Sequence, residues 1–486
     1  MDELFAIARA ALSSGEERVA LAKIDNAISG KGDDPQLLQW KALLHRSLDE
    51  HPSAVSAISS AHRLAPTNAS VTQGYAQIAL EAGLPAEQLF EQAWRLAPGK
   101  PDIMIGLCAA HVAAGNAPQA IAVLQQVLKQ SPQWIAGHQQ LARIFALTGA
   151  SEQIIASFNA ALTLRPRNVA LRRALVAALI DMRQYTAARD MVNDAPFDVS
   201  ANSLDDLHAA ILTELREDEL ADAMFARLPI GNGNNSDLFR ARHLLRVGRI
   251  DVLHKLLDGW LRPENPLFWP YAAIVWRMME DSRHDWLEGQ ESLVSIIDLT
   301  DRLPPLEQLA TCLRSLHERG GEMPEQSVRG GTQTDGMLFR RTEPEIQQVR
   351  EAVSEAVRQH IAGLAEMDPT HPTLRWRRDR AVRFAGSWSV RLGASGRHSN
   401  HVHPHGWLSS ALYVSLPEKR TNQPDNAGWL TLGEPQRSLG IELTSLRKIE
   451  PRSGRLVLFP STMWHGTLPF AEGERMTIAF DIAPPR

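Results

Sequence analysis

Prolines return at a nearly constant interval through the first 170 residues of this chain. Pro66, Pro98, Pro132 and Pro166 are separated by 32, 34 and 34 residues, and each follows a leucine-rich phrase such as RLAP at 63–66. The sequence between them is rich in Ala, Leu and Gln, which favour helices, whereas proline cannot continue a helix. This period predicts units of about 34 residues, each built from two helices.

Small residues occupy matching places in these units. An alanine lies five residues before the proline in three of them: Ala61, Ala93 and Ala161. A glycine falls between the two expected helices, where a turn needs one: Gly83, Gly115 and Gly149. Small side chains let the paired helices approach closely. A single unit of this kind cannot bury its own apolar face, so the units are expected to stack into an array.

The period and the small residues resemble the tetratricopeptide repeat, although the aromatic and glycine residues usual in its first helix are mostly missing. About five clear units occupy residues 33–200, with a weaker one before them. Later prolines continue the spacing in a less regular form: Pro196, Pro229 and Pro263. We therefore expect tetratricopeptide-like helical repeats over residues 1–200 and a helical region with degenerate repeats over residues 201–320.

The region between the repeats and the C-terminal part has three recognisable segments. Residues 264–320 remain helical in character and contain three tryptophans that we expect to pack where the array meets the next domain: Trp269, Trp276 and Trp286. The glycine-rich stretch 318–336 is predicted to be a loop, which either connects domains or lines a site. An amphipathic helix follows, with Ile346, Val349 and Val353 on the face predicted to pack on a sheet.

After residue 372 the hydrophobic period drops to two. Trp388, Val390 and Leu392 alternate with polar residues. Further strands are expected at 407–416, 428–432, 455–459 and 475–481. Short strands at this spacing are typical of a sandwich or barrel. The arginine-rich segment 374–384 is interpreted as a solvated strand face rather than a site for an acidic substrate.

Histidines gather in this C-terminal part. His401 and His403 have the spacing that places two side chains on the same side of a strand, and His465 is the natural source of a third imidazole. His405 repeats the spacing and is an alternative ligand. Imidazole ligands suit iron, copper, nickel or zinc. This pattern predicts a metal site.

Arg475 lies ten residues after His465 and shares a strand face with Thr477. A buried arginine beside a hydroxyl can bind a carboxylate with two hydrogen bonds. The alternative is an arginine paired with an acid of the protein, such as Glu472 or Asp481. A metal site nearby favours a small-molecule carboxylate.

Residues 326–486 resemble the 2-oxoglutarate- and Fe(II)-dependent oxygenases, in particular a bacterial group often fused to tetratricopeptide repeats. The matching phrases are GGTQT (330–334), SWSVRL (387–392), HVHPHGWLSSALYVSLP (401–417), GRLVLFPSTMWHGTLPF (454–470) and ERMTIAFDI (474–482). The resemblance implies an α+β double-stranded β-helix, or jelly-roll, over residues 321–486. It also implies Fe(II), 2-oxoglutarate as cosubstrate and dioxygen.

The resemblance also assigns roles to individual residues. His401, His403 and His465 match the metal positions. Arg475, assisted by Thr477, matches the residue that grips the distal carboxylate of 2-oxoglutarate, and Tyr413 and Trp388 are expected to help hold this cosubstrate. One departure matters, because the usual site has two histidines and one carboxylate. Here His403 stands at the carboxylate position, so the iron would have either three histidines or two with His403 behind them.

These observations favour a hydroxylase of a peptide or protein recruited by the repeats. The alternatives are a cupin-like metalloenzyme that does not use 2-oxoglutarate, and a non-catalytic repeat scaffold with a degenerate barrel. The repeats could also serve a homodimer. A net charge of −5 argues against a nucleic-acid partner, and no apolar run has membrane length. Two distant cysteines, Cys108 and Cys312, predict no disulfide framework and a cytoplasmic location.

Overall fold

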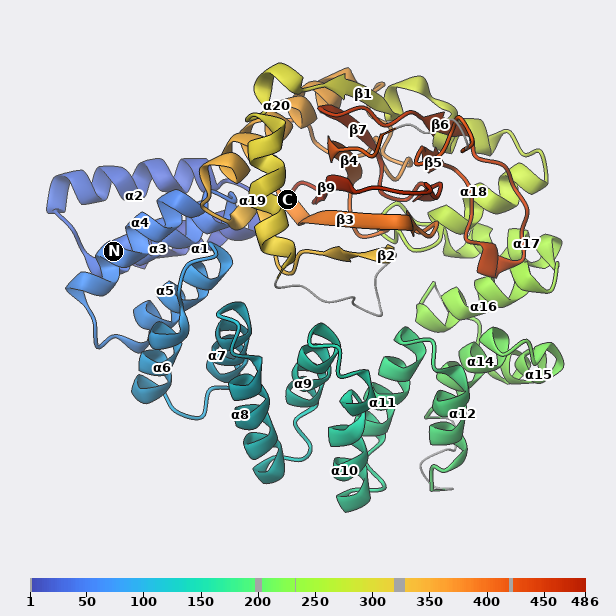
Figure 1. Cartoon of the computed structure of the whole chain (residues 1–486), viewed down its shortest axis with the longest axis horizontal. Helices are drawn as coiled ribbons and strands as arrows, with labels where there is room; N and C mark the ends of the chain where they lie inside the picture. The colour runs from blue at the N-terminus through green and yellow to red at the C-terminus, as the bar shows by residue number, and fades with distance from the viewer. Residues whose placement is uncertain (1, 197–202, 232, 319–327, 419–422) are drawn as a thin grey trace.

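The computed structural model describes residues 2–196, 203–231, 233–318, 328–418 and 423–486. Within these ranges, an array of helices comes first and a domain with two antiparallel sheets comes last (Figure 1). The expected domain boundaries near residues 200 and 320 lie outside the described residues. No helix described here is long and apolar enough to span a membrane. The predicted fold class, an all-α superhelical repeat array followed by a jelly-roll domain, is confirmed.

The array consists of antiparallel helix pairs. Its helices are α1 (Asp2–Ser14), α2 (Glu17–Lys31), α3 (Pro35–Ser47), α4 (His51–Leu64), α5 (Ala69–Glu81), α6 (Glu87–Leu96), α7 (Pro101–Ala113), α8 (Ala117–Gln130), α9 (Ile135–Leu147), η1 (Ser151–Gln153), α10 (Ala156–Leu164), α11 (Val169–Asp181), α12 (Tyr185–Asn193), α14 (Asp205–Glu214), α15 (Asp218–Arg227), α16 (Asn235–Arg246), α17 (Ile250–Trp260) and α18 (Trp269–Met278). The second helices α4, α6, α8 and α10 each end two residues before the repeated proline. The alanines five residues before it are buried between helices, as predicted.

The C-terminal domain contains a large and a small sheet. Its strands are β1 (Ser295–Asp298), β2 (Val328–Gln333), β3 (Phe384–His398), β4 (Leu408–Ser415), β5 (Leu430–Leu432), β6 (Arg447–Ile449), β7 (Arg455–Pro460), β8 (His465–Thr467) and β9 (Arg475–Ile482). The large sheet has the order β1-β7-β4-β9-β3-β2, and the small sheet has the order β6-β5-β8. All pairings are antiparallel. The strands expected from the alternating pattern are confirmed.

Four strands were not predicted: β6 and β8, the short edge strands of the small sheet, and β1 and β2 of the large sheet. β1 falls in a region expected to be helical, and β2 falls in the stretch expected to be loop, of which residues 319–327 lie outside the described part. Each is an edge strand that pairs with a longer strand far away in sequence, β1 with β7 and β2 with β3. Their extended conformation therefore depends on tertiary pairing, which a local pattern does not reveal.

Helices cover one face of the large sheet. These are α19 (Leu306–His317) and α20 (Pro344–Gly363). Short helices lie elsewhere in this part of the chain: η2 (Asp285–Gly289), η3 (Glu291–Leu293), η4 (Thr300–Arg302), η5 (Leu338–Arg340) and η6 (Arg437–Leu439). Ile346, Val349 and Val353 of α20 pack in one core with Leu412 of β4 and Leu456 of β7, as the amphipathic pattern predicted. This core leaves the opposite side of the sheet for the functional site.

Tryptophans mark the junction with the last helices of the array. Trp269 and Trp276 of α18 are buried in one core with Leu439 and Trp464 of the jelly-roll domain, and Trp286 packs against it. The indole of Trp464 donates a hydrogen bond to the backbone carbonyl of Pro270 at 2.9 Å. The predicted role of the three tryptophans, packing at the junction, is confirmed.

The array bends around the jelly-roll domain, so both of its ends reach that domain (Figure 1). At the N-terminal end, the backbone amide of Phe384 donates to Asp49 at 3.0 Å, and Arg383 forms an ion pair with Glu17 at 2.9 Å. At the other end, Arg277 of α18 donates to the backbone carbonyl of Gly433. The protein is therefore one connected assembly rather than two domains on a tether.

The interpretation of segment 374–384 as a solvated strand face is wrong. Most of it precedes β3, and four of its five arginines bind other parts of the chain, whereas Arg377 pairs with Asp379 within the segment. Arg380 pairs with Glu16 at 2.7 Å and Arg383 with Glu17, both in the repeat array, while Arg378 donates to carbonyls at the end of α20. The guanidinium groups are needed here because they join the array to the sheet domain.

Two buried histidines should make stability depend on pH. Burial lowers the pKa of both His317 and His360 to about 4. The unfolded chain binds these protons near pH 6.5, so unfolding takes up protons between about pH 4 and 6.5 and stability falls as the pH decreases through that window. Urea titrations at several pH values give the slope of the unfolding free energy against pH. In this window we expect the slope of the double variant His317→Gln/His360→Gln to be smaller than that of the wild type by up to about 2.7 kcal/mol per pH unit. An unchanged slope would contradict neutral, buried histidines.

Candidate metal centre

Backbone pairing brings the three predicted histidines together. His401 follows β3 and His465 begins β8, and the two residues face each other in an isolated antiparallel bridge. Their amides and carbonyls exchange hydrogen bonds of 2.9 and 3.0 Å. The amide of His403 donates to the carbonyl of Ser461 at 2.9 Å. The chain here is a bridge rather than a continuous strand, yet the two-residue spacing still directs both imidazoles to the same side.

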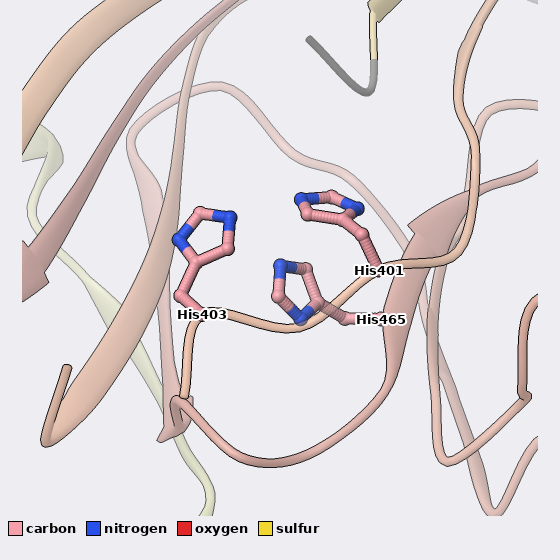
Figure 2. A group of neighbouring side chains, drawn as sticks. All are labelled: His401, His403 and His465. Atoms are coloured by element: carbon pink, nitrogen blue, oxygen red, sulfur yellow. The ribbon is translucent and has the colours of Figure 1, made fainter. Parts of the chain in front are cut away.

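The three imidazoles surround one common space, as Figure 2 shows. One nitrogen from each of His401, His403 and His465 lies within 4.8 Å of the others. The ring centroids are 4.2 Å apart for His401 and His465 and 4.9 Å apart for His401 and His403. His405 is exposed and lies outside this group, so the structure brings together His403 and not its alternative. Three converging imidazoles form an arrangement that a transition metal can occupy.

Each of these rings has its Nδ1 engaged. Nδ1 of His401 lies 2.7 Å from the carbonyl of Ser399, and Nδ1 of His465 lies 3.0 Å from the carbonyl of Met463. A carbonyl only accepts hydrogen bonds, so Nδ1 donates and the lone pair is on Nε2. His403 is oriented in the same way, because its Nδ1 lies 2.6 Å from a carboxylate oxygen of Asp481. Hydrogen bonds of this kind fix the tautomer and the orientation of metal-binding histidines.

The role of Asp481 was not predicted from the sequence, which offered this residue only as the less favoured partner of Arg475. Its carboxylate accepts hydrogen bonds from His403 and, at 2.5 Å, from Ser409. Ser409 on β4 is paired in register with Asp481 on β9. The strand pairing, once known, identifies this contact, whereas the linear sequence gives no sign of it. A carboxylate therefore belongs to the centre, one hydrogen bond behind the ring of His403.

Two polar residues beside the ligands, His398 and Asn400, have contacts of their own. The ring of His398 lies parallel to that of His401 with centroids 6.0 Å apart. The side-chain amide of Asn400 donates to the carbonyl of Pro435 at 3.1 Å, which ties the histidine segment to the loop beside η6. Both residues support the segment, while the orienting hydrogen bonds come from Ser399, Met463 and Asp481.

Burial favours the uncharged form of the His401 and His465 imidazoles. Removal from water lowers the pKa of His465 to about 3 and holds the pKa of His401 well below its usual value, with neighbouring histidines adding to the effect. Neutral imidazole is the form that binds a metal ion. At neutral pH the centre is therefore ready to bind a cation without first releasing protons from these two rings.

Arg475 lies beside the histidines in a setting suited to a carboxylate. It is 3% exposed, donates to the carbonyl of Gly428 at 2.6 Å, and lies over the ring of Tyr413 at 5.0 Å. Thr477 is paired across the strands with Tyr413. Among the residues that the structure describes, no acid forms an ion pair with Arg475, and its Nε has no hydrogen-bond partner. Unpaired buried groups of this kind are costly unless a ligand satisfies them.

One cavity of about 380 Å³ contains both groups. It is lined by the three histidines, Arg475, Thr477 and Trp388, whose ring lies 5.6 Å from that of His403. Tyr413 is fully buried and is not among the residues that line the cavity, but its ring contacts Arg475, which is. The arrangement can hold a divalent metal and, next to it, an anion with a carboxylate directed at Arg475.

This combination defines a class: a helical-repeat protein with a metal centre in a jelly-roll. Comparison with known families gives the class its two parts. Residues 386–481 match the family described as "Putative 2OG-Fe(II) oxygenase", and residues 85–144 match a tetratricopeptide repeat family. The chain thus contains one region that matches tetratricopeptide repeats and one that matches a putative 2-oxoglutarate- and Fe(II)-dependent oxygenase domain, as the motifs predicted.

Solved structures resemble either part of the chain. A prolyl-4-hydroxylase of Pseudomonas putida is 16% identical, with a TM-score of 0.27 over 40% of this chain and 92% of that one. A tetratricopeptide repeat protein of Parabacteroides merdae is 15% identical, with a TM-score of 0.32 over 54% of this chain and 98% of that one. Both scores are too low to support further argument. No curated protein matches the chain.

Proposed function

We propose that this protein is an Fe(II)- and 2-oxoglutarate-dependent oxygenase that hydroxylates a peptide or protein substrate recruited through its repeats. The observation that supports this most directly is the shared cavity. It holds three imidazoles with matching tautomers and, beside them, a buried arginine with no acid partner in the described part of the chain. A cupin-like metal site would have no use for this arginine.

The donor set fits the proposed cofactor. Imidazole nitrogen is a good ligand for Fe(II), and three of them leave positions for a chelating cosubstrate and dioxygen. Asp481 is not in the cluster of three, but its hydrogen bond to His403 places negative charge next to that ring and makes it a stronger donor. His401, His403 and His465 would hold the iron, and Arg475 with Thr477 would hold the distal carboxylate of 2-oxoglutarate.

Iron and 2-oxoglutarate would together supply the oxidising power for an unreactive C–H bond. The residues of the chain contribute binding, orientation and exclusion of water. Arg475 orients the cosubstrate through a charge-assisted contact in a dry pocket, where such a contact is strong. Phe459 and Trp388 line the same cavity and keep water from its apolar wall.

The test is an anaerobic titration of the metal-free protein with Fe(II) and then 2-oxoglutarate. An iron-bound keto acid gives a weak visible charge-transfer band, which we expect in the wild type. Replacing Arg475 by methionine should leave Fe(II) binding in place and weaken 2-oxoglutarate binding by about 10- to 100-fold, because a charge-assisted hydrogen bond is lost. Arg391→Met is the matched control, since Arg391 lies on the adjacent strand and pairs with Glu474 at the surface.

Each other outcome has a definite meaning. Metal binding without any band would reject the 2-oxoglutarate assignment and leave a cupin-like metalloenzyme. Failure to bind Fe(II), Mn(II) or Zn(II) would leave a repeat scaffold with a degenerate barrel. Equal losses in Arg475→Met and Arg391→Met would show that Arg475 acts on the fold rather than on the cosubstrate.

A further inference from the structure

The turns within the helix pairs share one backbone feature. In each pair, the second residue after the end of the first helix has a positive φ, which is the left-handed conformation. In the first pair it is the first residue after α1. These residues are Gly15, Asp49, Gly83, Gly115, Gly149, Arg183, Arg216, Gly248 and Glu280. Glycine adopts this conformation without strain, whereas other residues pay about 1 to 2 kcal/mol. A residue other than glycine at such a turn therefore needs a compensating contact.

Asp49 shows what such a contact can be. Its φ is +57°, and its buried carboxylate accepts the amide hydrogen of Phe384 and lies 3.6 Å from Arg340. Gly83 belongs to the next unit, and a side chain there would collide with Arg341. These two turns therefore lie against the jelly-roll domain, and Asp49 uses its strained position to hold that domain.

Arg183 occupies the same turn position between α11 and α12, also with φ of +57°. It is exposed, and it lines the cavity that contains the three histidines, although it comes from the repeat array. No ion pair or hydrogen bond joins its guanidinium to another described residue. The repeat array thus provides one wall of the candidate active site, and the residue at that wall is a strained arginine with a solvent-facing charge.

The charges of the cavity make this arginine unusual. Its lining contains three residues with formal charge: Arg183, Arg475 and Asp481. Arg475 and Asp481 carry opposite charges, and a divalent metal is offset by the doubly charged 2-oxoglutarate. Arg183 would then be the single uncompensated charge. An exposed cation at the edge of a cavity attracts an anion, and a guanidinium is suited to a carboxylate.

We propose that Arg183 binds a carboxylate of the substrate at the mouth of the metal cavity, and that the substrate is an acidic peptide segment. This inference rests on the proposed oxygenase function and deepens it, because it assigns a specificity-determining residue and a substrate class. The repeats then do more than recruit the substrate. They place a charge that selects which residue of it enters the cavity.

The variant that tests this is Arg183→Gly. Glycine favours the left-handed conformation at this turn, so the substitution removes the cation without destabilising the array. Arg216→Gly is the matched control. Arg216 is the equivalent residue of the next unit, is also exposed with φ of +64°, and pairs only with nearby Asp218, away from the cavity. Arg183→Lys keeps the charge but loses the two-pronged geometry.

Binding is measured by fluorescence anisotropy on protein loaded with Zn(II) and 2-oxoglutarate. The probes are three labelled pools of ten-residue peptides that differ only at the varied positions. The acidic pool carries Asp and Glu there, the basic pool carries Lys and Arg, and the neutral pool carries only uncharged residues. The acidic pool should bind best, and Arg183→Gly should weaken it by about tenfold, with Arg183→Lys intermediate and Arg216→Gly unchanged. N-Acetyl-aspartate amide as competitor distinguishes the source of the carboxylate. If this small acid displaced the labelled acidic pool as well as unlabelled acidic peptide does, the site would be assigned to a small acid rather than to a peptide.

The proposal is overturned if the acidic pool fails to bind, if another pool binds as well, or if Arg183→Gly and Arg216→Gly behave alike. The charge-transfer band of the Fe(II) and 2-oxoglutarate complex is recorded for the same variants. It should persist in Arg183→Gly, since Arg183 is not assigned to the metal or cosubstrate. A persistent band with no acidic preference would refute the role of Arg183 alone, and an absent band in the wild type would refute the oxygenase function.

Discussion

Asparagine in place of Asp481 should lower the affinity for Fe(II) by about 10- to 100-fold, although Asp481 lies behind a histidine rather than in the cluster of three. The carboxylate accepts the Nδ1 hydrogen of His403 at 2.6 Å and so keeps Nε2 unprotonated. The side-chain amide of asparagine has no charge, and its NH₂ group can donate to Nδ1 of His403. This would stabilise the His403 tautomer that carries its hydrogen on Nε2. That hydrogen occupies the position that a metal requires.

The measurement is Fe(II) affinity by anaerobic competition with a chelator, together with urea unfolding of the metal-free protein. Glu474→Gln is the control, because Glu474 precedes the same strand and pairs with Arg314 and Arg391 without touching a histidine. Metal affinity should fall in Asp481→Asn and stay unchanged in Glu474→Gln. If Asp481→Asn bound Fe(II) as tightly as the wild type, the role of the carboxylate in orienting His403 would be refuted.

The parts of this architecture that were predictable are those encoded by local periods. Prolines and small residues recur with the repeat, so the helix pairs follow from sequence alone, and the two-residue spacing of His401 and His403 places both rings on one side. The sequence also offered His465 as a third ligand and Arg475 as a carboxylate-binding residue, and the structure brings both into the same cavity. The resemblance to the oxygenases added the identity of the metal and of the cosubstrate. Spacing could not choose between His403 and His405, because that choice depends on how the bridge to His465 positions the backbone.

The parts that were missed all depend on contacts between distant residues. Asp481 meets His403 across 78 positions, and β2 is extended because β3 pairs with it. Arg183 has no motif around it, and its place in the cavity follows from the curvature of the whole array. The arginine-rich segment before β3 was misread for the same reason, because its acidic partners lie in the first helices of the chain.

That segment leads to the largest expected effect on stability. Arg383→Ala should destabilise the protein by about 3 to 5 kcal/mol, because it leaves the carboxylate of Glu17 buried without its cation. Glu17 is 1% exposed and Arg383 is 6% exposed, and the 2.9 Å ion pair between them spans 366 positions of the chain. Besides Arg383, Glu17 accepts a hydrogen bond from Ser47, and its second oxygen has no partner within the described residues.

Arg380→Ala is the control, because Arg380 lies three positions away and pairs with Glu16, which is 43% exposed. An exposed pair of this kind contributes about 0 to 1 kcal/mol. Urea unfolding compares the two variants with Glu17→Met/Arg383→Met, which removes both charges and should recover most of the loss in Arg383→Ala. Hydrogen exchange in α1 to α4 should increase in Arg383→Ala alone, since the pair attaches these helices to the sheet domain. Equal stabilities for Arg383→Ala and Arg380→Ala would mean that water reaches Glu17 and that the apolar contacts hold the array in place.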